Sequence, residues 1–323
     1  MKLLIPGGAG YIGSHTVKYA QEQGHEVVVI DDFSTGHEWA VKDCEIIRVN
    51  LLDQVKLAQS LKGRHFDGVI HFAAKSIVSE SFLKPDVYYR NNVVGTLNLV
   101  NEMMRNDNHH LVFSSSAAIF GNATMLRITE DHPKNPINPY GQSKLMVENM
   151  LRDICTANGM NITCFRYFNA AGAHNSGSIG EAHDPETHLI PNILNSIISN
   201  GAVLKVFGDD YETHDGTCVR DYVHVTDLAQ AHLLGLESMK IKKGFSAFNL
   251  GNSSGFSVME VIKSCKIETG SDIAYEICEK RLGDPAVLVS DASLATKVLG
   301  WKPQNESLAE IVRSAWHWHK SNQ

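Results

Sequence analysis

The chain has 323 residues, of which 43% are hydrophobic and 20% are charged, and this composition predicts a substantial core in one large domain or two modest ones. A formal net charge of −7 argues against a nucleic-acid surface. Because no apolar run of about 18 residues occurs, the sequence predicts no membrane span.

A glycine-rich turn stands near the start of the chain. Residues 2–5 are predicted to form a strand and residues 14–23 a helix, with Gly7, Gly10 and Gly13 between them. A turn of this kind lets the backbone approach a pyrophosphate, and the helix N-terminus offers free N–H groups. The spacing of Gly7, Gly10 and Gly13 is GxxGxxG, and a plain glycine turn is the alternative at this point.

A second strand, over residues 25–30, ends in Asp31 and Asp32. Asp31 follows Gly13 by 18 residues, where an acidic residue can accept hydrogen bonds from an adenosine ribose. A carboxylate there would repel a 2′-phosphate, so the position favours NAD over NADP. An aspartate in an ordinary strand-end turn is the alternative, and the preceding glycines favour the cofactor site.

Strands and helices alternate through the first half of the chain. Further strands are predicted over 45–49, 67–71, 110–113 and 161–166, and helices over 86–105 and 139–158. This alternation predicts an α/β fold with a doubly wound parallel sheet, in which ligands bind at the carboxyl ends of the strands. The glycine turn, Asp31, Phe72, Ser116 and residues 168–169 should all meet at that edge.

Tyr140 and Lys144 stand four residues apart in the helix predicted to begin at Pro139. That spacing places both side chains on one helix face. A nearby ammonium stabilises a phenolate and lowers the pKa of a tyrosine from its usual value of about 10. A serine hydroxyl from a second loop, Ser116, could hold the same substrate oxygen. The three residues predict a proton-transfer site, and two unrelated surface residues are the alternative.

After about residue 170 the regular alternation loosens. Loop-rich sequence runs from 172 to 220, interrupted by an apolar helical stretch over 190–198. Helices are predicted over 226–237, 256–268 and 307–318, and strands over 222–225, 245–250 and 273–277. We expect residues 1–170 to bind a dinucleotide. We expect residues 171–323 to form mainly a smaller mixed region that binds substrate, with some segments returning to the first domain.

Cysteine and histidine patterns bear on location and metals. The six cysteines are scattered, with no pair at metal-binding spacing, and the N-terminus does not resemble a signal peptide. We therefore expect a cytoplasmic protein with reduced thiols. His317 and His319 do not face each other on a helix, and no HExxH occurs. The sequence thus predicts no metal site.

Several long motifs carry a resemblance to a known family. They are GGAGYIGSH at 7–15, HFAA at 71–74, YYRNNVVGT at 88–96, SSSA at 114–117, PYGQSK at 139–144, RYFNAAGAH at 166–174, DGTCVRDYVHV at 215–225 and RLGDPA at 281–286. With these motifs the chain resembles the extended short-chain dehydrogenase/reductase family and, within it, the UDP-sugar 4-epimerases. The resemblance implies a Rossmann-type sheet, a cytoplasmic homodimer, and interconversion of UDP-glucose and UDP-galactose by transient oxidation at C4.

The resemblance also implies roles for individual residues. The catalytic residues would be Ser116, Tyr140 and Lys144. NAD would be held by Gly7, Gly10, Tyr11, Ile12, Gly13, Asp31, Asp32, Phe33, Ser34, Thr35, Gly36, Asn50, Leu51, Phe72, Ala73, Ala74, Lys75, Asn91, Ser114, Tyr140, Lys144 and Phe168. The UDP-hexose would be held by Ser116, Tyr140, Asn169, His188, Leu189, Lys205, Val206, Phe207, Arg220, Arg281, Asp284 and Leu288. Arginines suit the diphosphate, because guanidinium groups bind it in a forked geometry.

Three positions depart from the family pattern. Asn50 stands where an aspartate usually grips the adenine amino group, and its oxygen can still accept that bond, so we expect NAD binding that is kept but weaker. His188 stands where asparagine is common. Leu288 stands where relatives carry either a bulky tyrosine or a small residue. Its intermediate size predicts turnover of UDP-glucose and UDP-galactose, with slower turnover of the N-acetylated pair.

Other functions on the same fold remain open. A nucleotide-sugar 4,6-dehydratase typically carries Asp-Glu beside the catalytic serine or threonine, whereas Ala117 and Ala118 follow Ser116 here. An epimerase acting on a uronic acid or a pentose is a second alternative. A non-catalytic NAD-binding sensor is a third, since fold does not fix function, but the intact catalytic residues argue against it.

Overall fold

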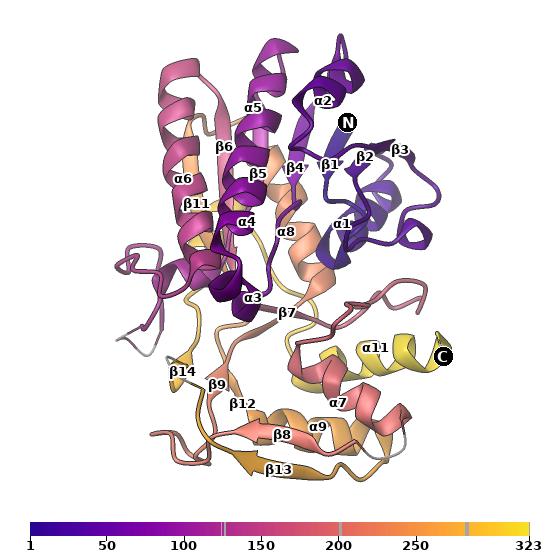
Figure 1. The fold of residues 1–323 in the computed structure, drawn as a ribbon, viewed down its shortest axis with the longest axis vertical. Coiled ribbons are helices and arrows are strands. Elements are labelled where there is room, and N and C mark those ends of the chain that lie inside the picture. The colour runs from indigo at the N-terminus through magenta and orange to yellow at the C-terminus, as the bar shows by residue number, and fades with distance from the viewer. Residues whose placement is uncertain (124, 126, 200–201, 282–283, 323) are drawn as a thin grey trace.

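Seven parallel strands form the main sheet of the computed structural model, which describes residues 1–323 except 124, 126, 200, 201, 282, 283 and 323 (Figure 1). The strands are β1 (Lys2–Pro6), β2 (Glu26–Asp31), β3 (Glu45–Arg48), β4 (Gly68–His71), β5 (His110–Ser114), β6 (Asn161–Tyr167) and β11 (Phe245–Leu250). Their order is β11-β6-β5-β4-β1-β2-β3. This is the order of a Rossmann-type sheet, extended by one strand beyond β6.

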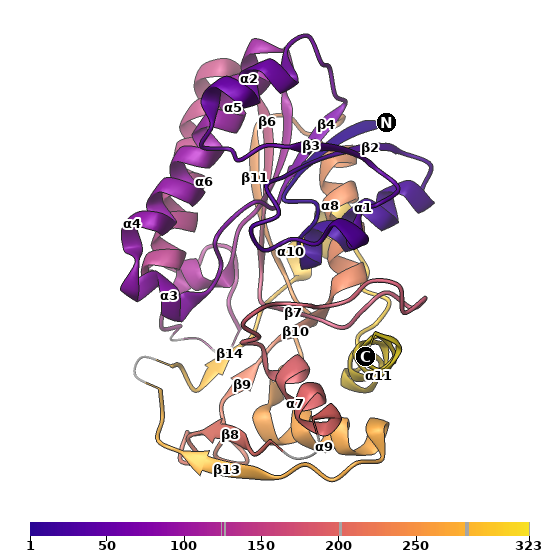
Figure 2. The same ribbon diagram turned by 45° about the vertical axis from the view of Figure 1, so that its right-hand side comes forward.

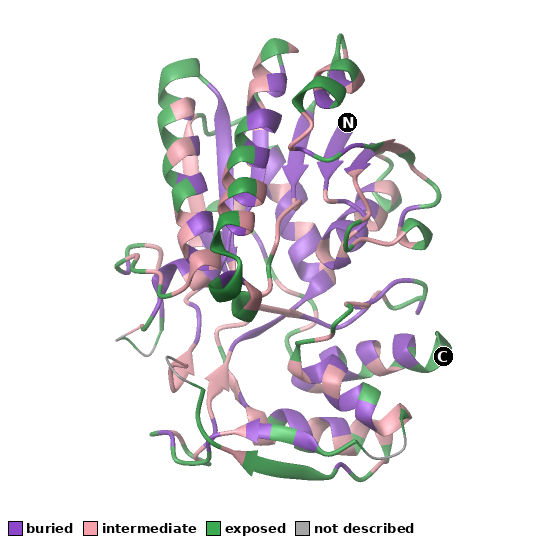
Figure 3. Ribbon diagram, viewed as in Figure 1, coloured by how far each residue is buried: buried purple, intermediate pink, exposed green. Residues whose placement is uncertain are grey.

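Helices cover both faces of this sheet, as Figure 2 shows. Alternate strand residues face opposite sides, so Leu3 and Ile5 pack on one face and Leu4 on the other. The first face is covered by α1 (Tyr11–Glu22), α8 (Val225–Ser238) and α10 (Ser293–Leu299), and the second by α2 (Gln54–Leu61), α5 (Gly95–Arg105) and α6 (Pro139–Asn158). The central strands are therefore buried on both sides (Figure 3). Within the described residues, no helix is long and apolar enough to cross a membrane.

A smaller region lies beyond the carboxyl ends of the strands (Figure 1). Its own core packs α7 (Leu189–Ile198), α9 (Val258–Thr269) and α11 (Leu308–Ser321) together. Its short strands are β7 (Asn169–Ala171) with β10 (Tyr222–His224), β8 (Leu204–Phe207) with β13 (Tyr275–Cys278), and β12 (Phe256–Ser257) and β14 (Val287–Leu288) on either side of β9 (Val219–Arg220). The chain enters this region after β6, returns to the main sheet through α8 and β11, and leaves it again.

The structure confirms the doubly wound parallel sheet and the first six strands predicted from the sequence. One predicted helix differs. Residues 86–105 are not one regular helix but α4 (Pro85–Tyr88), a π-helical turn η2 (Tyr89–Val94) and α5. The buried side chain of Asn92 in this turn bonds both the N–H and the C=O of Lys75 and the hydroxyl of Ser143. These tertiary bonds stabilise a wider turn that local sequence does not encode.

Short elements complete the fold near the ligand edge. They are α3 (Val78–Leu83) and two 3-10 turns, η1 (Glu38–Ala40) and η3 (Ala117–Phe120). The η3 turn follows β5 directly, and the Ser116 side chain caps it by accepting a hydrogen bond from the N–H of Ala118 at 3.1 Å. The strand β5 thus delivers Ser116 to the edge at which the other predicted ligand residues gather.

Candidate active site

Backbone hydrogen bonds continue past the strand ends and hold the loops of the carboxyl edge together. The N–H of Gly7 donates to Ile30, that of Phe72 to Pro6, and that of Ser115 to Phe165, each at 2.8 Å. The loops after neighbouring strands are therefore fixed side by side. This confirms that the glycine turn, Phe72 and the serine run converge at one edge.

The glycine turn makes a cradle for a diphosphate. Gly7 has φ +78°, and a Cβ at this position would lie 2.2 Å from the backbone N of Ala73. Only glycine permits both this conformation and this contact. The turn leads into α1, whose N-cap Gly10 has no capping side chain. The first N–H groups of α1 therefore remain available, with the positive end of the helix dipole, for a pyrophosphate.

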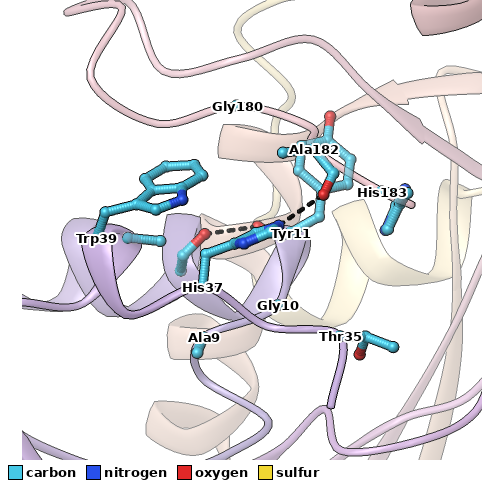
Figure 4. A pocket seen from close by; sticks show the side chains of 11 residues that line it. Ala9, Gly10, Tyr11, Thr35, His37, Trp39, Gly180, Ala182 and His183 are labelled. Carbon is cyan, nitrogen blue, oxygen red and sulfur yellow. Dashed lines mark hydrogen bonds between the residues drawn. The ribbon is translucent and has the colours of Figure 1, made fainter. Parts of the chain in front are cut away.

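Tyr11 is buried, and its hydroxyl makes a hydrogen bond within the protein. Its hydroxyl donates to the C=O of Gly172 at 2.6 Å, which ties the start of α1 to the second region. Figure 4 shows Tyr11 beneath a segment that passes through Gly180 and Ala182, and His37 bonds the C=O of Ala182 at 2.7 Å. The structure thus leaves the backbone of Tyr11, and not its hydroxyl, for the cofactor.

Two carboxylates stand at the end of β2, since Asp31 is its last residue and Asp32 follows it. Asp31 accepts hydrogen bonds from the N–H groups of Ala9 at 3.0 Å and Phe33 at 2.9 Å, which fix it beside the glycine turn. Burial raises the pKa of Asp31 from its usual value, while these two bonds act in the opposite direction. Asn50 donates to Asp32 at 2.6 Å, and its oxygen accepts the N–H of Leu52 at 2.8 Å. Asn50 is thus held by two bonds in the loop where adenine was predicted to bind.

The loop after β4 is held by a residue that the sequence analysis did not select as a site residue. Asn92 binds the Lys75 backbone through both ends of its amide and also bonds Ser143 on α6, at 2.8–3.0 Å. The neighbouring Asn91 bonds Asn92 at 3.1 Å. Asn92 therefore joins the predicted nicotinamide loop, residues 72–75, to the helix that carries Tyr140. The paired asparagines in the sequence were the only signal of this role.

Of the three predicted catalytic residues, Ser116 lies between β5 and η3, and Tyr140 and Lys144 lie on α6. Asn138 caps α6 by accepting the N–H of Gly141 at 2.8 Å, and Pro139 occupies the first turn. A Cβ on Gly141 would lie 2.4 Å from the C=O of Ala118, so this glycine allows α6 to touch the turn that carries Ser116. The hydroxyl of Ser116 is close enough to that of Tyr140 to lower its pKa.

Charges in this site differ from the sequence-based expectation. Lys144 is 3% exposed, and its Nζ donates to the C=O of Ser114 at 2.7 Å and lies 5.9 Å from the centre of the Tyr140 ring. Burial lowers the pKa of Lys144 to about 7. Burial also raises the pKa of Tyr140, against the nearby hydroxyl of Ser116, which lowers it. Desolvation is therefore the largest influence on the pKa of both groups.

We expect Lys144→Met to change stability in a pH-dependent way. The pKa of Lys144 is about 7 in the folded chain and near 10.4 when unfolded. Between pH 7 and about 10.4 the unfolded state binds more protons than the folded state, so the stability of the wild type increases with rising pH. The methionine of the variant does not titrate. The free energy of unfolding of the variant should exceed that of the wild type most below pH 7, and this difference should shrink toward pH 10. Urea unfolding of both nucleotide-free proteins at pH 6 and 9 measures this, and an equal difference at both pH values would contradict it.

A buried ion pair lies behind the catalytic helix. Arg166 on β6 donates to both carboxylate oxygens of Glu148 on α6, at 3.0 and 2.7 Å, and both side chains are almost fully buried. The Ser115 hydroxyl donates to the same carboxylate at 2.5 Å, and Arg166 donates to the C=O of Glu130 at 3.1 Å. Glu148 therefore links the serine run of β5, the strand β6 and the helix of Tyr140 and Lys144. The sequence analysis did not identify this network.

The predicted UDP residues fall into two groups. Arg220 bonds Asp284, its strand β9 pairs with Leu288 of β14, and Arg281 lies 4.0 Å over the ring of Phe207. Leu288 also packs against the cluster that contains Phe168. These residues are brought together near the catalytic turn.

The other group is spread over the start of α7 and the strands β7 and β8. His188 is the N-cap of α7, directly before Leu189, and its Nδ1 bonds Glu181. The ring of His188 is therefore engaged with a carboxylate of the preceding loop. Asn169 bonds the C=O of Asp221 through its side chain at 2.8 Å. Lys205 and Val206 lie in β8, and Val206 is buried.

Comparisons with known proteins agree with this geometry. The model of the NAD dependent epimerase/dehydratase family matches residues 3–251. A UDP-glucose 4-epimerase of Lactobacillus helveticus is 48% identical over 323 residues, which are 100% of this chain and 98% of the relative. One of Halalkalibacterium halodurans is 46% identical over 322 residues, which are 100% of this chain and 96% of the relative.

Solved structures show the same fold. A UDP-glucose 4-epimerase from Brucella ovis in complex with NAD has a TM-score of 0.94 and 44% identity, with 98% of each chain covered. One from Bifidobacterium longum in complex with NAD⁺ and UDP has a TM-score of 0.94 and 36% identity, and the match covers 100% of this chain and 99% of that one. The full-length matches, the Rossmann-type sheet and the site at its edge together place this chain in the NAD-dependent epimerase/dehydratase family.

Proposed function

We propose that this chain interconverts UDP-glucose and UDP-galactose by transient oxidation at C4 of the sugar, with NAD tightly bound. The observation that carries the proposal is the gathering of Ser116, Tyr140 and Lys144 at the same edge of the sheet as the glycine turn. The relatives with full-length matches and 46–48% identity are UDP-glucose 4-epimerases, which supports the choice of substrate.

The chain's own residues would manage the proton and the orientation of the sugar. Bound NAD supplies the acceptor, and later the donor, of the hydride exchanged with C4. Once ionised, Tyr140 would take the proton from O4 of the sugar and later return it to the same oxygen. Ser116 holds O4 by a hydrogen bond. Lys144 lies one helical turn from Tyr140, where its ammonium is available to the nicotinamide ribose and to the phenolate.

Epimerisation requires that the 4-keto sugar present its other face while the nucleotide stays fixed. Arg220 and Arg281 would hold the diphosphate and Asn169, Leu189 and residues 205–207 the rest of the UDP. Anchoring the UDP uses remote binding energy to position C4, and the sugar itself remains free to rotate. No net oxidation occurs, so the cofactor has no need to leave between turnovers.

Turnover without added cofactor is the test of this function. The purified chain is incubated with UDP-galactose, UDP-glucose and a panel of UDP-pentoses and UDP-uronic acids, and the products are separated by chromatography. We expect UDP-galactose and UDP-glucose to reach one equilibrium mixture from either side. Preferred turnover of a pentose or uronic acid, or loss of water to a 4-keto-6-deoxy sugar, would favour the alternative enzymes. No turnover at all would favour a sensor.

The cofactor itself can be identified from the same preparation. Asp31 lies where a 2′-phosphate would meet a carboxylate, and this supports NAD. Denaturing the purified protein should release about one nucleotide per chain, in keeping with one dinucleotide site per Rossmann sheet. NADP as the main released nucleotide would overturn the role given to Asp31.

The same proposal covers the oligomeric state and the binding roles of the two regions. We assign NAD binding to residues 1–170 and substrate binding mainly to 171–323, with α8, β11 and α10 serving the main sheet. Val94, Leu97 and Met146 expose apolar side chains on η2, α5 and α6, which supports a homodimer through these helices. The six free cysteines support a cytoplasmic location. Sedimentation equilibrium measures the mass of the assembly.

Leu288 is proposed to limit the size of the sugar's C2 substituent. It is partly buried and packs against the cluster of Phe168 and Ala117, beside Ser116. A bulkier side chain would narrow the space beside the sugar. Substrates with a large C2 substituent would then clash with it, and smaller ones would not. We expect Leu288→Tyr to suppress turnover of UDP-N-acetylglucosamine at least about tenfold more than that of UDP-glucose, about 1.4 kcal/mol of discrimination. Equal losses on both substrates would mean that Leu288 is ordinary core.

A further inference from the structure

Four side chains that could ligate a metal meet in the loop before α7. Glu181, His183, Glu186 and His188 each offer one ligand atom, and these atoms all lie within 4.8 Å of one another. Nδ1 of His183 lies 3.1 Å from an oxygen of Glu181 and 3.8 Å from an oxygen of Glu186, and His188 contacts Glu181 directly. The two imidazole rings are nearly perpendicular, at 85°, with centroids 5.2 Å apart. Both rings present Nδ1 to the carboxylate of Glu181.

The hydrogen bonding of this cluster is incomplete. Nδ1 of His183 is sealed from solvent and has no hydrogen-bond partner among the described residues, although it points toward two carboxylates. Glu181 is only 4% exposed and stands close to the second carboxylate, Glu186. A buried nitrogen without an aligned hydrogen bond is costly, and the two neighbouring carboxylates have only these histidines to offset their charge. A metal ion between them would satisfy both.

We propose that Glu181, His183, Glu186 and His188 bind one Zn²⁺ ion as a structural site. Imidazole nitrogens with carboxylate oxygens are ligands of zinc, whereas Ca²⁺ and Mg²⁺ take oxygens only. Ligand atoms about 2.0–2.2 Å from a tetrahedral ion lie roughly 3.3–3.6 Å from one another, a spacing that the cluster reaches with small side-chain shifts. Two carboxylates and two neutral imidazoles balance the charge of a divalent ion. Four protein ligands leave no open position for catalysis.

The position of the cluster explains what the ion would do. The segment between Gly180 and His183 covers the cofactor turn, where the ring of His183 lies 6.1 Å from that of Tyr11 (Figure 4). The same ligand segment ends at His188, the N-cap of α7. The ion would thus fix the chain that joins the cover of the dinucleotide site to the substrate region. Glu181, His183 and Glu186 also line a pocket with Trp318 and His319 of α11, which gives the ion a path of entry.

The proposal gives a role to His188 that differs from a nucleotide contact. Its ring is held by Glu181 at the start of α7, so zinc binding would use the side chain where relatives carry asparagine. The ligands are separated by one, two and one residues, which match neither a helix nor a strand period. This irregular spacing is why the sequence predicted no metal site.

Zinc content tests the site. The full chain is incubated with an equimolar amount of ZnSO₄, desalted, and analysed by plasma mass spectrometry together with the double variant His183→Gln/Glu186→Gln and the control His174→Gln. His174 lies in the preceding loop, where it bonds Ser176 and not the cluster. We expect about one zinc per chain in the wild type and the control, and less than about a tenth of that in the double variant, since a structural site needs all four ligands.

A second measurement guards against misfolding. Circular dichroism must show that the double variant is folded, and the single variant Glu186→Gln replaces it if it is not. Removing zinc with EDTA should lower the melting temperature of the wild type and leave the variant unchanged, because only the zinc-bound native state is stabilised by the ion. Wild-type protein that retains no more zinc than the variant would mean that the cluster is an ion-pair network only. Equal zinc in a folded variant would place the metal elsewhere, and either result overturns the proposal.

Discussion

Tyr140→Phe should lower turnover of UDP-galactose by about 10²–10⁴-fold, the usual contribution of a positioned general base. The substitution removes only the hydroxyl of Tyr140, which lies near Ser116, and keeps the ring. The fold and the bound NAD should therefore be retained. Initial rates with saturating UDP-galactose measure the loss, and the nucleotide released on denaturation reports whether the cofactor site survives.

A matched phenol offers the control for this experiment. Tyr167 is a neighbouring tyrosine whose hydroxyl bonds the side chain of Ser114. Tyr167→Phe also deletes one buried hydroxyl, but this one lies behind the serine run and not on the proposed path of the proton. The control should lose less than about tenfold, in line with one neutral hydrogen bond of roughly 1 kcal/mol. The assignment of the base would be wrong if Tyr140→Phe kept more than about a tenth of the wild-type rate.

The fold was largely predictable from the sequence because its signals are local. Apolar runs such as residues 26–30 and 110–113, separated by helical segments, give a parallel sheet through short-range pattern alone. The π-helical turn at Tyr89–Val94 was not predictable, because Asn92 forms it by bonding Lys75 and Ser143, far away in sequence. Tertiary bonds of this kind override helix propensity.

The candidate site was predictable in position and less so in electrostatics. The pairing of Tyr140 with Lys144 follows from helix geometry, but the pKa of each group depends on burial, which spacing does not reveal. The role of Glu148, which follows Lys144 by one more turn of α6, could not be predicted for the same reason. Its partner Arg166 lies on the strand β6, so only the folded chain brings the two charges together.

Glu148→Gln is expected to destabilise the folded chain by about 3–5 kcal/mol, because it leaves the buried guanidinium of Arg166 without its counter-charge. The pair is bidentate and is almost fully enclosed between α6 and β6. The exposed pair of Arg64 and Glu45 is the control, and Glu45→Gln should cost only about 0.2–1 kcal/mol. Urea unfolding of the three proteins measures both differences.

Replacing both charges separates the cost of an unpaired charge from the value of the pair. Glu148→Leu combined with Arg166→Met should cost less than the sum of the two single changes, because neither ion is then left buried alone. Turnover should nevertheless fall in the double variant, since Ser115 loses its acceptor and the serine run is no longer fastened to the helix of Tyr140. A Glu148→Gln protein as stable as the Glu45→Gln control would show that Arg166 finds other acceptors. The network would then not be what aligns β5 with α6.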